Sequence, residues 1–236
     1  MRWRVLAWGL VMLSACGTAE RTRPAQSKDS TGTTGAARAA APAAVPRAQP
    51  QTVLFVGTSL TAGLGLDPDS AYPALIQRKI DAAGLPFHVV NAGVSGETSA
   101  GALQRMEWLL REPFRVMVLE TGANDGLRGT PASETRRNIQ AIIDSVRAAR
   151  PDVRILLVQM EAPPNMGQRY TRAFHETYPL LAARNGVTLL PFLLDGVAGH
   201  PSLNQADGMH PNDVGEKMVA RNVWKGLEPV LRTVGR

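Results

Sequence analysis

From Thr52 onward, short apolar runs alternate with longer segments of helical periodicity. The apolar runs are rich in valine and leucine, and they cover residues 52–57, 87–90, 115–121, 153–160 and 187–191. Such runs are typical of strands that are covered on both faces. Helical patterns lie at 71–83, 99–111, 131–149, 168–185 and 212–231. The alternation predicts an α/β fold, with a five-stranded parallel sheet inside a three-layer α/β/α sandwich.

The segment 131–149 shows the helical pattern most clearly. Thr130 is a residue type that caps helices, Pro131 suits the first helical position, and Pro151 prevents continuation. Apolar residues recur at helical spacing, at Ile139, Ile142, Ile143 and Val146. We therefore expect Thr130 to be the N-cap of a long amphipathic helix.

The beginning of the chain has the layout of a secretion signal. Residues 1–15, MRWRVLAWGLVMLSA, carry two arginines, an apolar run and then small residues before Cys16. The apolar run is shorter than the roughly 20 residues that span a bilayer. The stretch LSAC resembles the lipobox of bacterial lipoproteins, which makes Cys16 the expected lipidation site; an ordinary signal cleaved nearby is the alternative. Cys16 is the only cysteine, so no intramolecular disulfide can form.

Residues 16–50 are dominated by small residues, proline and arginine, which predicts a disordered tether in front of a folded domain of residues 51–236. The formal net charge of +6 does not indicate nucleic-acid binding, because residues 51–236 hold 19 basic and 18 acidic side chains. We expect a monomer that is anchored by its lipid in the cell envelope, on the periplasmic face. Gly17 after the lipidation site favours the outer membrane.

Ligands of parallel sheets bind beyond the carboxyl ends of the strands, and three polar segments fall at that edge. Ser59 follows the first expected strand, residues 91–96 follow the second, and residues 122–125 follow the third. A serine hydroxyl is a weak nucleophile at neutral pH. It needs an imidazole to accept its proton and a carboxylate to orient that imidazole.

Asp207 and His210 in QADGMHPND are the candidates for this carboxylate and imidazole. Their three-residue spacing lets one turn bring them together, although the same residues also suit an ordinary turn. Acyl transfer further requires donors where negative charge develops. The backbone N–H of Gly96 and the side-chain amide of Asn124 are candidates for these donors. The segments that contain these two residues are equally typical of simple turns at the ends of strands.

Four segments in this order, VGTSLTAG, NAGVSGETS, ETGANDGLRG and DGMHPN, resemble the sequence blocks of the SGNH, or GDSL, hydrolase family. The resemblance covers nearly all of residues 51–236 and is strongest to bacterial multifunctional esterases, acyl-thioesterases and lysophospholipases, which include arylesterases. It implies a flavodoxin-like α/β sandwich and no metal or organic cofactor. It also implies roles for individual residues: Ser59 as nucleophile, His210 as general base and acid, Asp207 as its orienting carboxylate, and the Ser59 N–H, Gly96 N–H and Asn124 amide as the oxyanion hole.

The function implied by the resemblance is hydrolysis of carboxylic esters or thioesters through an acyl-enzyme. Aryl esters, short to medium acyl esters and lysophospholipids are the expected small-molecule substrates, and the loop 161–170 is expected beside the acyl pocket. Two alternatives remain open at this point: an O-deacetylase of envelope polysaccharide that uses the same site, and a non-catalytic binding module of the envelope.

Thr58 departs from the family pattern, which usually has aspartate before the serine. Since the expected triad carboxylate is Asp207, we expect Thr58 to affect the support of the turn more than the bond-making step. Among the other histidines, His175 is expected to be a surface or packing residue, His88 lies in a strand, and His200 is a candidate for the pocket wall. Four scattered histidines and a single cysteine do not indicate a zinc site.

Overall fold

A five-stranded parallel sheet organises residues 50–235, the part of the chain that this computed structural model describes. The strands are β1 (Gln51–Gly57), β2 (Phe87–Gly93), β3 (Val116–Leu119), β4 (Arg154–Gln159) and β5 (Thr188–Phe192). Their order across the sheet is β2-β1-β3-β4-β5, and every neighbouring pair is parallel. The expected signal peptide, Cys16 and almost all of the expected tether lie outside the described residues.

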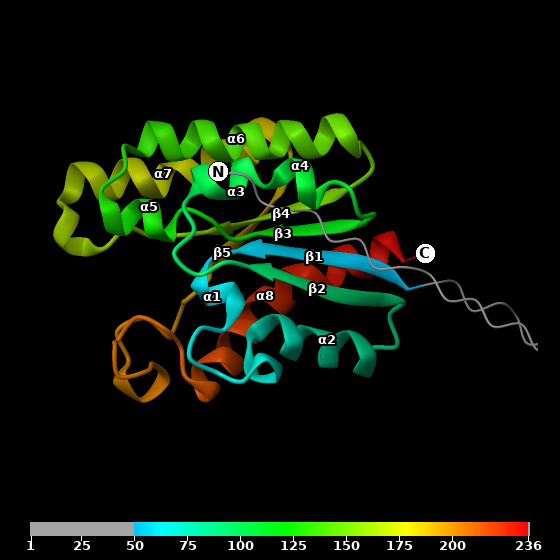
Figure 1. Cartoon of the computed structure of the whole chain (residues 1–236). Helices are drawn as coiled ribbons and strands as arrows, with labels where there is room; N and C mark the ends of the chain where they lie inside the picture. Colours follow the sequence, from blue (N-terminus) through cyan, green and yellow to red (C-terminus); the bar gives the residue numbers. More distant parts are fainter. Residues whose placement is uncertain (1–49, 236) are drawn as a thin grey trace, which may run out of the picture. The chain divides into compact units, whose positions relative to one another are not determined.

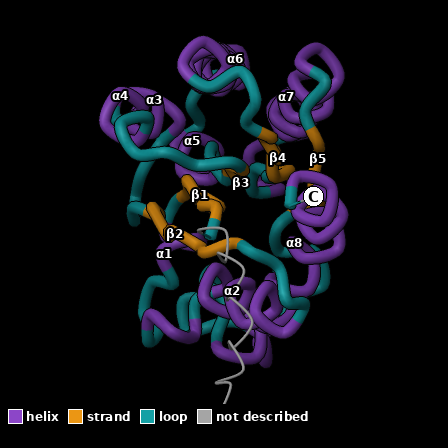
Figure 2. The backbone as a smooth tube through the Cα atoms, turned by 90° about the vertical axis from the view of Figure 1, so that its right-hand side faces the viewer, coloured by secondary structure: helices purple, strands orange, loops and turns teal. Residues whose placement is uncertain are grey.

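Helices cover both faces of the sheet, as Figures 1 and 2 show. The helices on one face are α2 (Tyr72–Ala82) and α8 (Asp213–Val234), and those on the other are α3 (Ser99–Gln104), α4 (Met106–Leu109), α6 (Ala132–Ala149) and α7 (Gln168–Asn185). Two short helices, α1 (Ser59–Ala62) and α5 (Ala123–Arg128), begin just after β1 and β3. The predicted three-layer α/β/α fold with a five-stranded parallel sheet is confirmed.

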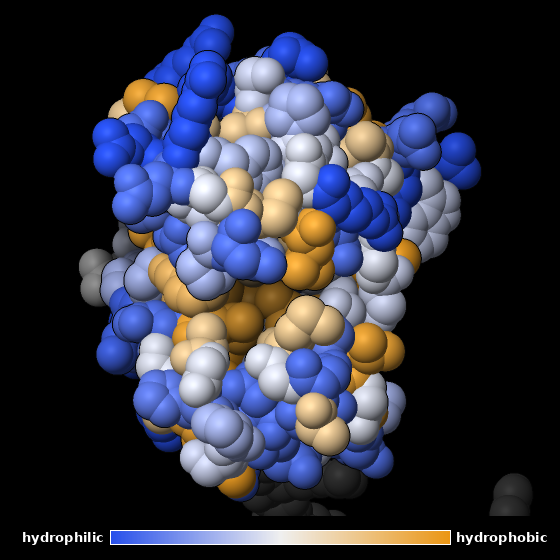
Figure 3. Space-filling model, turned by 90° about the vertical axis from the view of Figure 1, so that its left-hand side faces the viewer, coloured by the Kyte–Doolittle hydropathy of each residue, from blue (hydrophilic) through white to orange (hydrophobic). Residues whose placement is uncertain are grey.

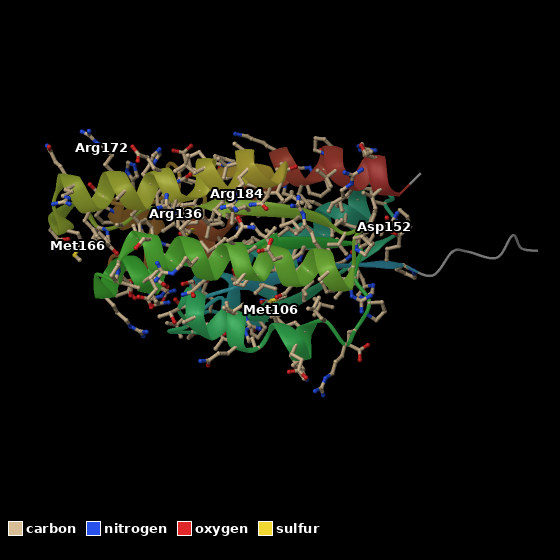
Figure 4. The ribbon with its side chains drawn as sticks, turned by 90° about the horizontal axis from the view of Figure 1, so that it is seen from above. Met106, Arg136, Asp152, Met166, Arg172 and Arg184 are labelled. Atoms are coloured by element: carbon tan, nitrogen blue, oxygen red, sulfur yellow. The ribbon has the colours of Figure 1, made fainter. Side chains whose placement is uncertain are left out.

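The core lies between the sheet and its two helical layers. β3 is buried along its whole length, as expected for a central strand with helices on both sides. The apolar stripe of α6 faces the sheet, and its members Ile139, Ile142, Ile143 and Val146 are fully buried. Figure 4 looks down on this layer and shows α6 and α7 side by side, with Met166 at one end of the molecule and Asp152 at the other.

Two predicted details of the helices are wrong. The segment 99–111 is not one helix, because Arg105 leaves helical geometry with φ −92° and ψ 0° and separates α3 from α4. Pro131, not Thr130, is the N-cap of α6, and its side chain cannot cap. The Thr130 backbone is engaged elsewhere: its N–H donates to Asp125 O at 3.0 Å, and its carbonyl accepts from Tyr170 Oη at 2.7 Å.

The short 3-10 helices Pro68–Ser70, Pro164–Met166 and Pro201–Leu203 lie in connecting segments. Within residues 50–235, no helix combines the length and the apolar character that a bilayer span requires.

Glu216 links α8 to α2, the two helices that cover the same face of the sheet. Its carboxyl accepts the backbone N–H of Tyr72 at 2.7 Å, and this contact supplies α2 with the cap that Ala71, its own N-cap, cannot provide. Glu216 is buried, and burial raises its pKa to about 8, with a further contribution from the charge of Asp213. The folded protein therefore holds a proton on Glu216 at neutral pH.

This proton predicts how the free energy of unfolding depends on pH. Between about pH 4.5 and about pH 8, folded Glu216 is protonated and unfolded Glu216 is ionised, so the folded state binds more protons and stability falls as pH rises. Glu216→Gln keeps the acceptor but cannot titrate. The unfolding free energy of this variant relative to the parent should increase by on the order of 1 kcal/mol or more between pH 5 and pH 8 in urea titrations. A constant difference across that range would contradict the assignment.

Candidate active site

Ser59 lies at the start of α1, immediately beyond the carboxyl end of β1. Thr58, in extended conformation, is the N-cap of this short helix. The tight strand-to-helix turn points the Ser59 hydroxyl out of the sheet edge toward the segment that precedes α8. There it meets His210, with 2.9 Å between Ser59 Oγ and His210 Nε2.

His210 is held on its other side by Asp207. The distance between His210 Nδ1 and Asp207 Oδ2 is 2.6 Å, and Asp207 Oδ1 accepts the backbone N–H groups of Met209 and His210. The hydrogen bond from the His210 ring, with those from the two backbone groups, lowers the pKa of Asp207 to about 2. An ionised carboxylate only accepts hydrogen bonds, so Nδ1 carries the imidazole proton and Nε2 is free to accept the Ser59 proton.

The loop that carries His210 is tied to the loop that carries Ser59 by the side chain of Gln205. Its Nε2 donates to Leu64 O at 2.7 Å, just after α1, and to Pro211 O at 2.9 Å. The Gln205 backbone N–H also donates to His210 O at 2.7 Å. One side chain thus fixes the separation between two segments about 150 residues apart, a separation on which the Ser59–His210 contact depends.

Three residues with available hydrogen-bond donors, Ser59, Gly96 and Asn124, line one cavity. The N–H of Ser59 and the N–H of Gly96 donate to no other group among residues 50–235. Asn124 Nδ2 donates one proton to Glu97 O at 2.9 Å, which leaves its second proton available. Gly96 adopts φ +77°, a left-handed conformation that disfavours any side chain.

The segments with Gly96 and Asn124 are braced against each other. Asp125, fully buried beside Asn124, accepts the Ser99 N–H at 2.8 Å and the Ser99 hydroxyl at 2.5 Å. The Glu97–Arg105 ion pair closes the same loop at 2.6 Å, and Arg105 also donates to Ala92 O. The positions of both candidate oxyanion donors are therefore set by buried or half-buried polar contacts, which hold a loop more rigidly than exposed ones.

A buried carboxylate, Glu120, lies beneath the serine turn. It accepts the Thr58 N–H at 2.7 Å, the Thr58 hydroxyl at 3.0 Å and the Thr61 hydroxyl at 2.9 Å. The Tyr72 hydroxyl completes the chain by donating to Thr61 Oγ1 at 2.8 Å. Burial raises the pKa of Glu120, and these donors oppose the shift. Thr58 therefore supports the turn as expected, chiefly through this carboxylate.

An apolar cavity of about 540 Å³ opens beside Ser59 and His210. Figure 3 shows it as a hollow with a hydrophobic floor on the face at the carboxyl edge of the sheet. Gly96 and Asn124 line it together with apolar side chains that include Leu60, Leu127, Met160, Phe192 and Leu194. Residues 161–164 form part of its wall. They are the first part of the loop 161–170 that was predicted to lie beside the pocket.

The remaining histidines lie apart from Ser59. His88 Nε2 contacts Thr52 Oγ1 at 3.0 Å across β1 and β2. His175 is exposed, and its Nδ1 pairs with Glu161 Oε1 at 2.7 Å. His200 lines a separate hollow and not the wall of the cavity, for which it was a candidate. In the described part of the chain, no group of three histidine, cysteine or acidic side chains is arranged to hold a metal ion.

Sequence reasoning missed Glu120 and Gln205, and it placed Glu161 in the pocket loop 161–170 without singling it out. For Glu120 a signal existed: a carboxylate closes an otherwise apolar strand, ahead of a glycine turn. The structure also explains Gly57, where a side chain would collide with Glu120 and Thr61. Gln205 and Glu161 gave no comparable pattern, since both sit in loops of mixed composition.

Comparisons with known proteins identify the relatives of this chain. Residues 55–218 match the family described as GDSL-like Lipase/Acylhydrolase. Esterase TesA of Pseudomonas aeruginosa is 40% identical over 186 residues, which are 78% of this chain and 92% of that protein. Thioesterase 1/protease 1/lysophospholipase L1 of Escherichia coli K12 is 38% identical over 181 residues, 76% of this chain and 85% of that protein.

Solved structures show the same relationship. The psychrotrophic esterase EstA from Pseudoalteromonas, inhibited by monoethylphosphonate, superposes with a TM-score of 0.72 at 33% identity, over 77% of this chain and 99% of that one. The family match covers more than half of the chain, and the relatives exceed 30% identity over most of its length. The chain belongs to the GDSL-like lipase/acylhydrolase family, the SGNH hydrolases.

Proposed function

We propose that the protein is a serine esterase that cleaves carboxylic esters and thioesters through an acyl-enzyme, with Ser59, His210 and Asp207 as its triad. The observation that carries the proposal is the unbroken chain of contacts from Asp207 Oδ2 through the imidazole to Ser59 Oγ, at 2.6 Å and 2.9 Å. Both distances allow proton transfer without rearrangement. A non-catalytic binding module would not require this alignment of Asp207, His210 and Ser59 next to the three available donors of Ser59, Gly96 and Asn124.

The reaction begins with attack of Ser59 Oγ on the acyl carbon while its proton moves to His210 Nε2. The carbonyl π electrons move to oxygen, and the resulting oxyanion accepts from the Ser59 N–H, the Gly96 N–H and the Asn124 amide. Collapse expels the alcohol or thiol, which takes the proton from His210. A water molecule then attacks the acyl-serine with His210 again as base. As this second intermediate collapses, Ser59 Oγ takes the proton back from His210 and the free acid leaves.

The cavity favours acyl and aryl groups over sugars. Its wall is mostly aliphatic and aromatic, so burial of an alkyl chain gains about 0.8 kcal/mol per methylene, whereas sugar hydroxyls would lose hydration there. Aryl esters, short to medium acyl esters and lysophospholipids fit this lining better than acetylated polysaccharide does. The relatives named esterase, thioesterase and lysophospholipase support the same classes.

We also propose that the protein is located in the cell envelope. The signal-like residues 1–15 and the lipobox-like LSAC would bring a monomer to the periplasmic face of a membrane, anchored by lipid on Cys16. Envelope lipids and exogenous esters are then within reach, whereas cytoplasmic acyl-CoA is not.

Ser59→Ala tests the nucleophile. This variant should lose p-nitrophenyl acetate hydrolysis by up to about a millionfold, as in serine proteases, and should no longer be labelled by a fluorophosphonate probe. Ser202→Ala, which alters an exposed serine of the 3-10 helix Pro201–Leu203, is the matched control and should keep both. Parent-like turnover or labelling in Ser59→Ala would refute the assignment.

Asn124→Ala tests the oxyanion hole. Removal of one oxyanion donor should lower kcat by about 100-fold to 1,000-fold. Asn222→Ala removes an amide that bonds Asp195 O outside the cavity lining, and its kcat should stay near that of the parent. A loss in Asn124→Ala of less than about 10-fold would remove this amide from the mechanism.

Thr58→Val tests the Glu120 network. The variant keeps the branched shape but removes the hydroxyl that donates to Glu120, so the serine turn loses one support and the carboxylate loses a donor. We expect kcat to fall about 10-fold with KM little changed, on the scale of one buried hydrogen bond, and Thr58→Ser to restore it. Equal kcat in parent and Thr58→Val would show that the hydroxyl does not position Ser59; circular dichroism would confirm that each variant is folded.

A further inference from the structure

A carboxylate interrupts the apolar wall of the cavity. Among the described residues that line it, only Glu161 and His210 are ionisable, and the mechanism above uses only His210. Apolar neighbours around Glu161 include Met160, Ala162 and Pro163. A charged side chain in an apolar wall stays hydrated and weakens the binding of hydrocarbon beside it. We therefore expect Glu161 to take part in substrate recognition.

The Glu161 carboxylate is fixed through one oxygen and open at the other. Oε1 contacts His175 Nδ1 at 2.7 Å and accepts from Gln159 Nε2 at 3.2 Å. Oε2 receives no hydrogen bond within residues 50–235. Glu161 belongs to the cavity lining, and 32% of its side chain is exposed. Glu161 can therefore accept from a ligand without breaking a contact it already has.

The sheet order gives the position of Glu161 relative to Ser59. Ser59 follows β1, Glu161 follows β4, and β3 lies between these strands. Neighbouring strands are about 4.8 Å apart, so the two residues lie about 10 Å apart along the carboxyl edge. An acyl chain attached to Ser59 and extended along the cavity would bring its far end to Glu161.

We propose that Glu161 is a specificity-determining residue that favours acyl chains ending in a cationic group and disfavours chains ending in a carboxylate. The inference rests on the esterase function proposed above and adds a preference within it. A fixed negative charge on a low-dielectric wall attracts a cation and repels an anion more strongly than the same charge in water. Acyl chains with an uncharged end contact only the apolar groups around Glu161. They serve as the reference for the cationic and anionic chains.

Neighbouring charges do not cancel this effect. His175, the direct partner of Glu161, is largely outside the cavity, with 55% of its side chain exposed. The guanidinium of Arg128 donates to Gly96 O at 3.0 Å. Neither side chain belongs to the cavity lining, so Glu161 is the charge that a bound chain meets.

The test uses three p-nitrophenyl esters that share one acyl chain and differ only at its end, which is a methyl, a trimethylammonium or a carboxylate group. Values of kcat/KM are measured at low ionic strength and about pH 8, where imidazoles are ordinarily neutral. The parent should prefer the cationic to the anionic ester by about 10-fold or more. Glu161→Gln, which keeps the contacts to His175 and Gln159, should reduce this ratio by about 10-fold, equivalent to about 1.4 kcal/mol.

Glu176→Gln is the matched control, because it removes an exposed carboxylate one residue beyond His175 that does not line the cavity. Its ratio of cationic to anionic ester should equal that of the parent. The same ratio in parent and Glu161→Gln, or no preference in the parent, would overturn the inference. If the methyl-terminated ester is not hydrolysed in a Ser59-dependent way, the proposed function fails first, and the two failures are thereby distinguished.

Discussion

A parallel sheet places the carboxyl ends of all its strands on one edge, and most of the candidate site depends on that constraint. Ser59, Asn124 and Glu161 are distant in sequence, yet each follows a strand and so reaches the same edge. His210 is the exception, because it precedes a helix and follows no strand directly. Its contact with Ser59 across 151 residues therefore needs a separate tie, which Gln205 supplies.

The serine turn shows how a buried carboxyl group can be accommodated by neutral partners. Glu120 would lose much hydration energy on burial, and three donors from Thr58 and Thr61 replace the lost water. Thr58, which stands where the family usually has aspartate, supplies two of these donors, its backbone N–H and its hydroxyl. The residue before the serine is therefore part of the support of the turn.

Much of the fold could be predicted from the sequence, because apolar runs and helical spacing reflect burial directly. The five strands and the long helices appear where their patterns lie, and Ser59, Asp207 and His210 meet as expected. The break at Arg105 and the cap at Pro131 could not be predicted, since tertiary contacts of the Arg105 side chain and the Thr130 backbone decide them. Gln205 acts through a partner far away in the sequence, and Glu161 contacts a residue on another element. Such contacts cannot be predicted from local composition. The lipid anchor on Cys16 stays a prediction.

The turn that holds Asp207 has a consequence for acid tolerance. This carboxylate is 41% exposed, yet three hydrogen bonds from the same short turn, those of the His210 ring and of the backbone N–H groups of His210 and Met209, keep its pKa at about 2. It therefore stays ionised in all but strongly acidic solution. In the proposed reaction, the group that orients the imidazole would then act as a constant negative charge throughout the working range.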